Sequence, residues 1–170
     1  MSRIAAVVLA AGEASRFGSP KQHILLPRVI ERLRDASVDE VVVVEGAHLL
    51  AAGATRVVSC LDWERGPGAS LRCGLAALGD DVEAAIVVLA DGPNLAPQAV
   101  ERVLDVWRAS GGLVAASYDG ARGHPLVLGR TDWVDIPDEG LRERPVRLVP
   151  CDDLGAPGDV DTPEDLPVDP

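Results

Sequence analysis

Aromatic residues are scarce in this sequence: Phe, Trp and Tyr together make up 3% of the 170 residues, although 47% of the residues are hydrophobic. The core must therefore be built mainly from Ala, Val, Leu and Ile. A chain of this length buries roughly 70% of its unfolded surface, so it needs neither disulfides nor metals to hold it together. The length predicts one domain that spans residues 1–170.

The chain has few cysteines. It has neither a long apolar run nor an excess of positive charge. The three cysteines, Cys60, Cys73 and Cys151, fit neither CxxC metal spacing nor a disulfide framework, which predicts a protein of the reducing cytoplasm. No apolar run approaches the roughly 20 residues of a membrane helix, and we expect no signal peptide before the first strand. The net charge of −11 disfavours a nucleic-acid-binding surface.

Strands rich in β-branched residues alternate with helical patterns along the first two thirds of the chain. The expected strands lie at 4–9, 40–44, 55–59 and 84–90, and the expected helices at 27–36, 69–78 and 96–109. The alternation then breaks, with strands expected at 113–118, 125–128 and 146–149. Continuous apolar strands separated by helices indicate a mostly parallel sheet with helices on both faces. The predicted fold class is therefore α/β, a doubly wound domain with a mixed edge in its last third where a ligand could bind.

The loop after the first expected strand combines small residues with two cations. Ala10, Ala11 and Gly12 allow backbone amides to approach a ligand closely, and Arg16 and Lys21 follow. In open α/β sheets, ligands bind beyond the carboxyl ends of the strands. The loop matches neither the Walker A motif GxxxxGK[ST] nor the dinucleotide motif GxGxxG.

Lys21 is the only lysine of the chain, whereas arginine occurs fifteen times. An ammonium is a compact point charge that can move with a phosphate, and a planar guanidinium does not replace it. Residues 1–34 also carry six basic and two acidic side chains. The pattern predicts an anion site near the N-terminus; the alternative is a solvated loop whose lone lysine arose by chance.

Three aspartates stand where a metal could bind. Asp91 directly follows a buried strand pattern and precedes Gly92-Pro93, so it lies at the carboxyl end of a strand; its alternative role is to cap the turn. Asp159 and Asp161 alternate along the chain, so an extended backbone points both carboxylates to one side. Mg²⁺ prefers one or two carboxylates together with phosphate oxygens and water, so Asp91 is a candidate ligand, with Asp159 or Asp161 as a candidate for the second. Asp161 is favoured of the two, and the alternative is that both are solvated.

These segments resemble the MobA-like NTP transferases, in particular the molybdenum cofactor cytidylyltransferases. Residues 9–21, LAAGEASRFGSPK, are similar to the family signature LAAGxxxRxGxxK, and residues 159–166, DVDTPEDL, to its DIDTPEDL ending. The resemblance implies that Arg16 and Lys21 hold the triphosphate and that they are, with Asp91, the catalytic residues. The implied nucleotide-binding residues are Leu9, Ala10, Ala11, Gly12, Arg16, Lys21 and Ser70.

Weaker matches carry the resemblance over nearly the whole chain. Residues 63–71, WERGPGASL, are similar to a WxxGxxxSL segment that lies near the nucleotide, although Ser70 by itself is typical of a helix cap. Residues 120–125, GARGHP, are similar to a GxxGHP turn that shapes the acceptor pocket, which implies Gly123, His124 and Pro125; a lone His before Pro is more often structural. The segment DEGLR at 138–142 is similar to GDEGLR, with Pro in place of the first Gly.

The resemblance implies an Mg²⁺-dependent cytoplasmic enzyme that moves a nucleoside monophosphate from an NTP onto a phosphorylated small-molecule acceptor such as molybdopterin. Pyrophosphate would leave, and a molybdoenzyme would be the client. CTP is favoured over GTP because cytidylyl members have Ala, and guanylyl members usually Gly, at the position of Ala11. The alternatives are a guanylyltransferase, a sugar-phosphate nucleotidyltransferase on the same fold, and a nucleotide- or cofactor-binding chaperone without turnover.

Two departures from the family pattern concern the acceptor. The chain after Lys21 is shorter than usual before the next helix, which trims a surface near the site. The residue after Asp91 is usually Gln in the molybdenum cofactor group and here is Gly92, which removes an amide that could contact a ligand. Neither departure removes an implied catalytic group.

Overall fold

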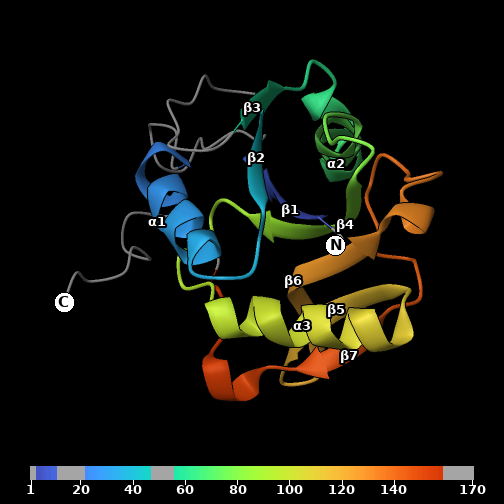
Figure 1. Ribbon diagram of the computed structural model, residues 1–170. Coiled ribbons are helices and arrows are strands. Elements are labelled where there is room, and N and C mark those ends of the chain that lie inside the picture. Colours follow the sequence, from blue (N-terminus) through green and yellow to red (C-terminus); the bar gives the residue numbers. More distant parts are fainter. Residues whose placement is uncertain (1–2, 11–21, 47–55, 159–170) are drawn as a thin grey trace.

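The structure is a computed structural model that describes residues 3–10, 22–46 and 56–158 (Figure 1). The strands and helices expected from the sequence are present, although several bounds differ. The strands are β1 (Arg3–Leu9), β2 (Glu40–Glu45), β3 (Arg56–Ser59), β4 (Val82–Leu89), β5 (Leu113–Tyr118), β6 (Ala121–Gly129) and β7 (Arg147–Pro150). The helices are α1 (Gln22–Arg34), α2 (Pro67–Ala76) and α3 (Pro97–Ser110), with short 3₁₀ turns at Trp63–Arg65, Arg130–Asp132 and Asp152–Leu154.

The strands of the described chain form one sheet in the order β3-β2-β1-β4-β6-β5-β7. β1 pairs in parallel with β2 and β4, and β2 pairs in parallel with β3. β6 runs antiparallel between β4 and β5, and β7 pairs in parallel with β5. The middle of β1 and of β4 is fully buried, which explains why these strands are continuous apolar runs. The predicted doubly wound, mostly parallel sheet with a mixed last third is confirmed.

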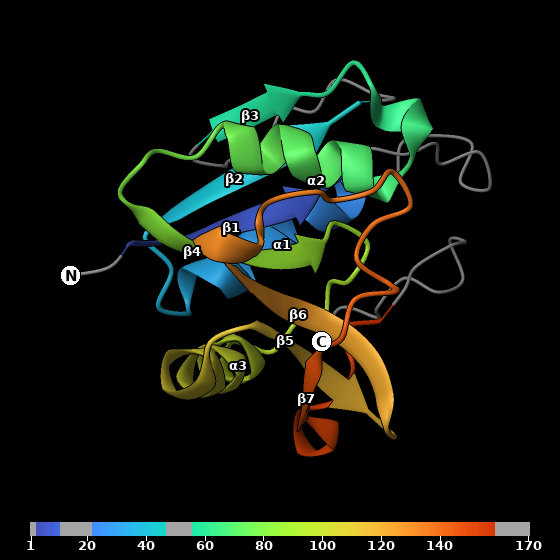
Figure 2. The same cartoon turned by 90° about the vertical axis from the view of Figure 1, so that its right-hand side faces the viewer.

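Different helices cover the two faces of the sheet (Figures 1 and 2). Val8 and Val88 belong to a buried cluster with residues of α1 and α3, whereas Val7 and Val87 belong to a cluster with residues of α2. Because neighbouring residues of a strand point to opposite faces, each central strand contributes to both clusters. Three leucines on α2 and just after it are buried in the cluster that contains Val7 and Val87: Leu71, Leu75 and Leu78.

Helix α1 begins at Gln22 and contains Pro27, whereas the sequence predicted that Pro27 would start it. A proline inside a helix removes one backbone hydrogen bond and usually ends or kinks the helix. Here the apolar face of α1 is packed into the core, with Val29 and Leu33 fully buried. Burial of that face stabilises the helix more than local propensity opposes it, so the expected boundary was wrong.

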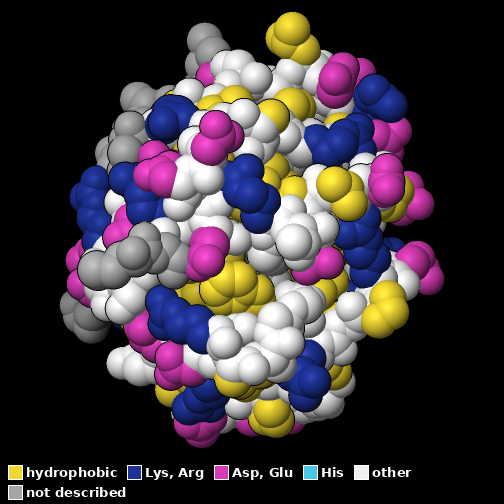
Figure 3. All heavy atoms as spheres, turned by 45° about the vertical axis from the view of Figure 1, so that its right-hand side comes forward, with side chains coloured by type: hydrophobic (Ala, Val, Ile, Leu, Met, Phe, Trp, Pro, Cys, Tyr) yellow, Lys and Arg dark blue, Asp and Glu magenta, His cyan; other side chains and the backbone are white. Residues whose placement is uncertain are grey.

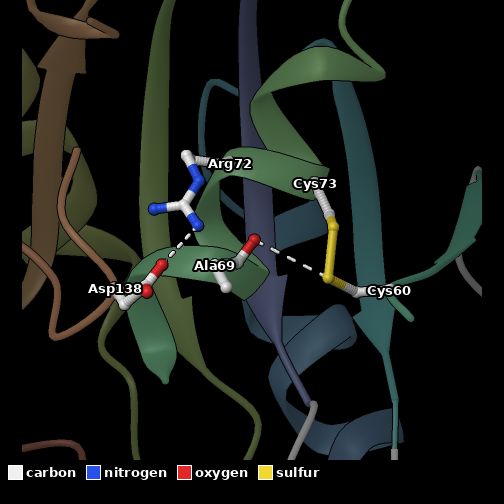
Figure 4. The surroundings of a disulfide bond; sticks show 5 residues. All are labelled: Cys60, Ala69, Arg72, Cys73 and Asp138. Atoms are coloured by element: carbon white, nitrogen blue, oxygen red, sulfur yellow. Dashed lines mark hydrogen bonds and ion pairs between the residues drawn. A yellow bond between two sulfur atoms is a disulfide. The ribbon is translucent and has the colours of Figure 1, made fainter. Parts of the chain in front are cut away.

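Two of the three cysteines are paired, contrary to the expectation from the sequence. Cys60, which follows β3, and Cys73 on α2 form a disulfide with their Cα atoms 5.8 Å apart (Figure 4). Cys151 is a free, buried thiol. The expectation was wrong because a separation of 13 residues carries no motif; the pair forms because α2 packs beside β3. The cysteines therefore no longer favour a reducing compartment.

Candidate active site

The loop with the family signature leaves the sheet at the carboxyl end of β1. The Ala10 amide donates to the Val44 carbonyl oxygen at 2.9 Å, and the Ala90 amide donates to the Leu9 carbonyl oxygen at 3.1 Å. These bonds extend the pairing of β1 with both neighbouring strands and fix the point where the loop begins. The remaining loop residues that the resemblance implies lie outside the described residues: Ala11, Gly12, Arg16 and Lys21.

Asp91 lies at the carboxyl end of β4, as the sequence predicts. The preceding Ala90 is buried, and so is the Oδ1 atom of Asp91, while the side chain as a whole is partly exposed. The Gly92 amide donates to the Leu89 carbonyl oxygen at 3.3 Å and closes the turn after the strand. The carboxylate is thus fixed by a central strand of the sheet, a position from which it can hold a cation.

Gly92 permits the last described segment of the chain to pack against this turn. The Asn94 amide donates to the Pro157 carbonyl oxygen at 2.9 Å. A Cβ atom built on Gly92 would come within 3.0 Å of the Pro157 Cβ atom and 3.4 Å of the Gly158 carbonyl oxygen. A larger side chain at position 92 would displace this segment, so the departure from the family pattern has a structural reason.

His124 lies on β6 within the predicted acceptor turn. The Tyr118 hydroxyl donates to the His124 carbonyl oxygen at 2.7 Å. Gly123 leaves room for the Tyr118 ring, which a Cβ atom at that position would approach to 2.9 Å. The His124–Pro125 peptide bond is cis, and Pro125 is buried. The contacts of Tyr118 with His124 and Gly123 fix the backbone at His124.

The imidazole of His124 is neutral near pH 7. Burial is the largest cause that lowers the pKa of His124, and the positive charge of Arg122 is the next; the resulting pKa is about 4. The negative charge of Asp91 acts in the opposite direction. Asp91 and His124 are therefore electrostatic neighbours, although one follows β4 and the other lies on β6. A neutral imidazole offers one N–H donor and one acceptor nitrogen, so His124 can bind a polar ligand group without adding charge.

We expect protonation of His124 to lower the stability of the protein in weak acid. Its pKa is about 4 in the folded protein and 6.5 in an unfolded chain, so only the unfolded state takes up the proton between these values. The neutral imidazole contributes about 3 kcal/mol to the free energy of unfolding. This contribution is complete above pH 6.5 and is lost as the pH falls toward 4. Urea unfolding of wild type and His124→Gln across this range measures it. The difference between the two proteins should change with pH; parallel curves would rule out the buried neutral imidazole.

Two cavities meet at His124. The first, which we call the Tyr118 cavity, has a volume of about 380 Å³ and lies between the end of β4, Tyr118 and residues 156–158. The second, which we call the Arg122 cavity, has a volume of about 440 Å³ and lies between β6, the first turn of α2 and residues 139–142. Leu89, Gly123 and His124 line both. A ligand in either cavity would therefore contact the predicted acceptor turn.

The segment 137–142 is docked on the start of α2 and forms one wall of the Arg122 cavity. The Gly68 amide donates to the Asp138 carbonyl oxygen at 2.8 Å, and a side chain at Gly68 would overlap the backbone of this segment. Arg72 donates to the Asp138 carboxylate at 2.5 Å (Figure 4), and Arg65 lies 3.2 Å from it. The hydrogen bond from Arg72 lowers the pKa of the Asp138 carboxyl, so the attachment is charged near neutral pH.

Ser70 does not line either cavity in the described part of the structure. It is 2% exposed within α2, whereas Pro67 and Leu71, one helical turn apart, line the Arg122 cavity. Its nucleotide contact stays a prediction. Of the other expected residues, Leu9, Gly123 and His124 line this cavity, and Asp91 neighbours His124.

Arg122 and Arg142 also line the Arg122 cavity, and neither was predicted from the sequence as a site residue. Alternate residues of a strand point to the same side, so the position of Arg122 two residues before His124 was a usable signal. Arg142 is the last residue of the DEGLR segment, but that match does not place it at the cavity, because its place depends on the attachment of Asp138 to α2.

The surface is mixed in charge on the face shown in Figure 3, where basic and acidic side chains are interspersed and no broad patch of one sign stands out. Within the described ranges, no helix is both long enough and apolar enough to cross a membrane.

Comparisons with known proteins agree with the fold. The chain is similar to Rv0371c from Mycobacterium tuberculosis H37Rv, with 29% identity and a TM-score of 0.81 over 96% of this chain and 95% of that one. Rv0371c in complex with manganese gives 28% identity and a TM-score of 0.75 over 96% of each chain. A nucleotidyl transferase from Methanothermobacter thermautotroptrophicus gives 23% identity and a TM-score of 0.72 over 96% of this chain and 94% of that one. No curated protein matches the sequence.

The family assignment rests on a match over most of the chain. Residues 6–149 match the MobA-like NTP transferase domain, a stretch that runs from β1 to β7 and includes the signature loop, Asp91 and the GHP turn. The similar solved structures share the fold over 96% of the chain. The chain therefore belongs to the MobA-like NTP transferase domain family, and its fold is that of a nucleotidyltransferase.

Proposed function

We propose that this protein is an Mg²⁺-dependent cytidylyltransferase that moves CMP from CTP onto a phosphorylated small molecule such as molybdopterin. One observation carries the proposal: Asp91, at the carboxyl end of β4, lies beside the neutral His124, and two cavities meet at His124. A carboxylate fixed at that edge suits a reaction between two anionic phosphates, because their charge must be neutralised before they can approach.

Asp91 fits a magnesium ligand because Mg²⁺ takes carboxylate oxygens and usually keeps only one or two of them from the protein. Among the described residues, no group of three or more His, Cys, Asp or Glu could hold a metal by itself, so Asp159 and Asp161 are proposed to complete the site with phosphate oxygens. The last described residue, Gly158, lies close to Gly92, next to Asp91, which supports this assignment. The manganese complex of the similar Rv0371c also favours a divalent metal.

The proposed reaction needs no side-chain nucleophile. An oxygen of the acceptor phosphate attacks the α-phosphorus of CTP, the bond from that phosphorus to the oxygen bridging to the β-phosphate breaks, and pyrophosphate leaves with the electron pair. Arg16 and Lys21 are proposed to hold the triphosphate, and a bound Mg²⁺ supplies charge neutralisation. The protein therefore contributes orientation and electrostatic stabilisation.

Several finer assignments belong to this proposal. The small residues Ala10 and Ala11 favour CTP, and Ser70 is proposed to lie near the nucleotide. We also propose that residues 1–170 form one domain, that the reaction takes place in the cytoplasm, and that a molybdoenzyme is the client. In the cytoplasm, the Cys60–Cys73 pair would meet reducing conditions, where disulfides are rare.

Titration calorimetry with Mg²⁺ and each of CTP and GTP tests the choice of nucleotide, and pyrophosphate release with CTP and molybdopterin tests turnover. We expect CTP to bind more tightly than GTP and pyrophosphate to form only when the acceptor is present. Equal or tighter binding of GTP would assign the protein to the guanylyl group. The protein could instead bind a nucleotide tightly and release no pyrophosphate with either molybdopterin or a sugar phosphate as the acceptor. That result would favour the alternative of a nucleotide- or cofactor-binding chaperone without turnover.

A further inference from the structure

The Cys60–Cys73 disulfide closes a loop that runs from the end of β3, through the turn at Trp63–Arg65, into α2. We call residues 60–73 the disulfide-closed loop. Cys73 points from α2 toward Cys60, whereas its neighbour Arg72 points to the other side of the helix, toward Asp138 (Figure 4). The helix that carries the disulfide therefore also carries a contact to one wall of the Arg122 cavity.

That wall, the segment 137–142, is held by the disulfide-closed loop. In the described part of the chain, every residue that donates a hydrogen bond to Asp138 or forms an ion pair with it lies between the two cysteines: Arg65, Gly68 and Arg72. Gly66 allows a close approach as well, because a Cβ atom at that position would overlap the Asp138 carbonyl oxygen. The attachment of the wall thus comes from one short stretch of chain whose two ends the disulfide joins.

The two cysteines differ in exposure. Cys60 is 2% exposed, whereas Cys73 is partly exposed on α2. An external thiolate therefore reaches the Cys73 sulfur first, and Cys60 is the leaving group. The Cys60 Sγ atom lies 3.6 Å from the Ala69 carbonyl oxygen (Figure 4), so the thiol formed by reduction can donate a hydrogen bond to that oxygen. The same packing accommodates both the bonded and the reduced pair.

A disulfide in the proposed cytoplasmic location needs a physical reason. Disulfides are rare there, and those that occur are usually transient, catalytic or redox-sensing. Transfer of a nucleotide between two phosphates oxidises and reduces nothing, so the pair has no part in the proposed chemical step. A redox-sensing role is the one that agrees with both the location and the reaction.

We propose that the Cys60–Cys73 pair is a redox switch: the disulfide keeps the disulfide-closed loop attached to segment 137–142, and reduction by a dithiol loosens that segment and the cavity wall that it forms. The inference rests on the cytoplasmic location in the proposed function, and it goes beyond the transfer reaction. It makes the redox state of two cysteines a control on the shape of the Arg122 cavity.

The chemical step is a thiol–disulfide exchange. A thiolate of the dithiol attacks the Cys73 sulfur, the bond between the two cysteines breaks, and Cys60 leaves as a thiolate that takes up a proton. The second thiol of the dithiol then loses its proton and attacks the mixed disulfide, so that Cys73 leaves and is protonated. The protein gains two electrons and two protons, and the dithiol is oxidised to its own disulfide.

Amide hydrogen exchange, followed by mass spectrometry on the full chain, tests the switch before and after treatment with excess reduced dithiothreitol. In the chain-entropy model, a cross-link around a loop of about 15 residues favours the folded arrangement by a factor of about 10². We therefore expect reduction to speed exchange about tenfold or more in residues 61–72 and 137–142. The amides of β4 should stay protected over the same short exchange times, and oxidised glutathione should restore slow exchange.

Three variants locate the effect. Cys73→Ser should exchange as the reduced protein does and should not respond to dithiothreitol. Cys151→Ser is the matched control, because Cys151 is a free, buried thiol outside the disulfide-closed loop, and it should respond as wild type does. Asp138→Ala removes the carboxylate that the loop holds. Its residues 137–142 should therefore exchange fast in both redox states, whereas residues 61–66 should still respond.

A disulfide that excess dithiothreitol does not open without denaturant would be a structural cross-link, and this result would overturn the switch. An opened disulfide with unchanged exchange in residues 137–142 would overturn it as well, because the coupling would be missing. Pyrophosphate release with CTP and molybdopterin, measured on the same samples, should fall on reduction, and equal turnover in both states would also overturn the switch. A chain that forms no pyrophosphate in either state fails as a transferase, and the exchange rates then decide the switch alone.

Discussion

Asp91→Asn is expected to abolish metal-dependent nucleotidyl transfer and to leave the fold intact. Replacement of one carboxylate oxygen by an amide nitrogen keeps the size of the side chain but removes its charge and one oxygen ligand, and a neutral amide holds Mg²⁺ poorly. A loss of turnover by a factor of about 10²–10³ or more is expected, as for removal of one well-placed electrostatic group. Pyrophosphate release, titrated with Mg²⁺, measures the loss, and circular dichroism checks the fold.

Asp119→Asn is the matched control, because Asp119 is an exposed aspartate in the turn between β5 and β6. It has a positive φ of 54°, which Asn adopts readily, so this variant should fold and work normally. The same change made separately at Asp159 and Asp161 identifies the second ligand. Near-normal turnover of Asp91→Asn would mean that Asp91 only caps the turn after β4.

A second readout of Asp91→Asn does not depend on activity. The negative charge of Asp91 raises the pKa of His124, against the larger effects of burial and Arg122. In the metal-free variant, the imidazole should therefore titrate below its wild-type value of about 4. NMR titration of the histidine ring protons detects this shift, and an unchanged pKa would show that the two side chains are not neighbours.

The position of Asp91 was predictable from the sequence because it depends on local pattern. A continuous apolar strand that ends at Ala90 must place the next residue at the sheet edge, and in an open α/β sheet that edge binds ligands. The same reasoning gave the alternation of strands and helices and the start of the loop at Leu9, which hydrogen bonds to its neighbouring strands fix.

The Arg122 cavity was not predictable in the same way, because its walls come from parts of the chain that are distant in sequence. Arg122 lies on β6, whereas Arg142 reaches the cavity only because Asp138 is attached to α2 by Arg72. No periodicity in the sequence reports that attachment. The Cys60–Cys73 pair was missed for the same reason, since the packing of α2 beside β3 brings the two thiols together.

Ser70 shows a different limit of motif reading. Its match to the WxxGxxxSL segment implies a helix near the nucleotide, and the first turn of α2 reaches the Arg122 cavity. Residues four apart share a face of a helix, so Pro67 and Leu71 line the cavity together while Ser70, at 2% exposure, lies inside. A motif can therefore point to a segment and still leave open which of its side chains would contact a ligand.

Lys21→Ala is expected to lower kcat by about 10²–10³ while changing CTP binding much less. This expectation holds if Lys21, which lies outside the described residues, neutralises charge that develops on the α-phosphate in the transition state. An interaction made mainly in the transition state lowers kcat and kcat/KM together, whereas loss of ground-state binding raises KM. Steady-state pyrophosphate release over a range of CTP concentrations separates the two effects.

Two companion variants decide what Lys21 does. Lys21→Arg keeps the charge but replaces a compact ammonium by a planar fork, so it should restore activity only in part. Arg16→Ala should instead raise KM for CTP more than it lowers kcat, if Arg16 mainly grips the β- and γ-phosphates in the ground state. The three variants thus separate a transition-state charge from a binding charge on one loop. A Lys21→Ala enzyme with wild-type kcat would leave the only lysine of the chain as a residue of a solvated loop.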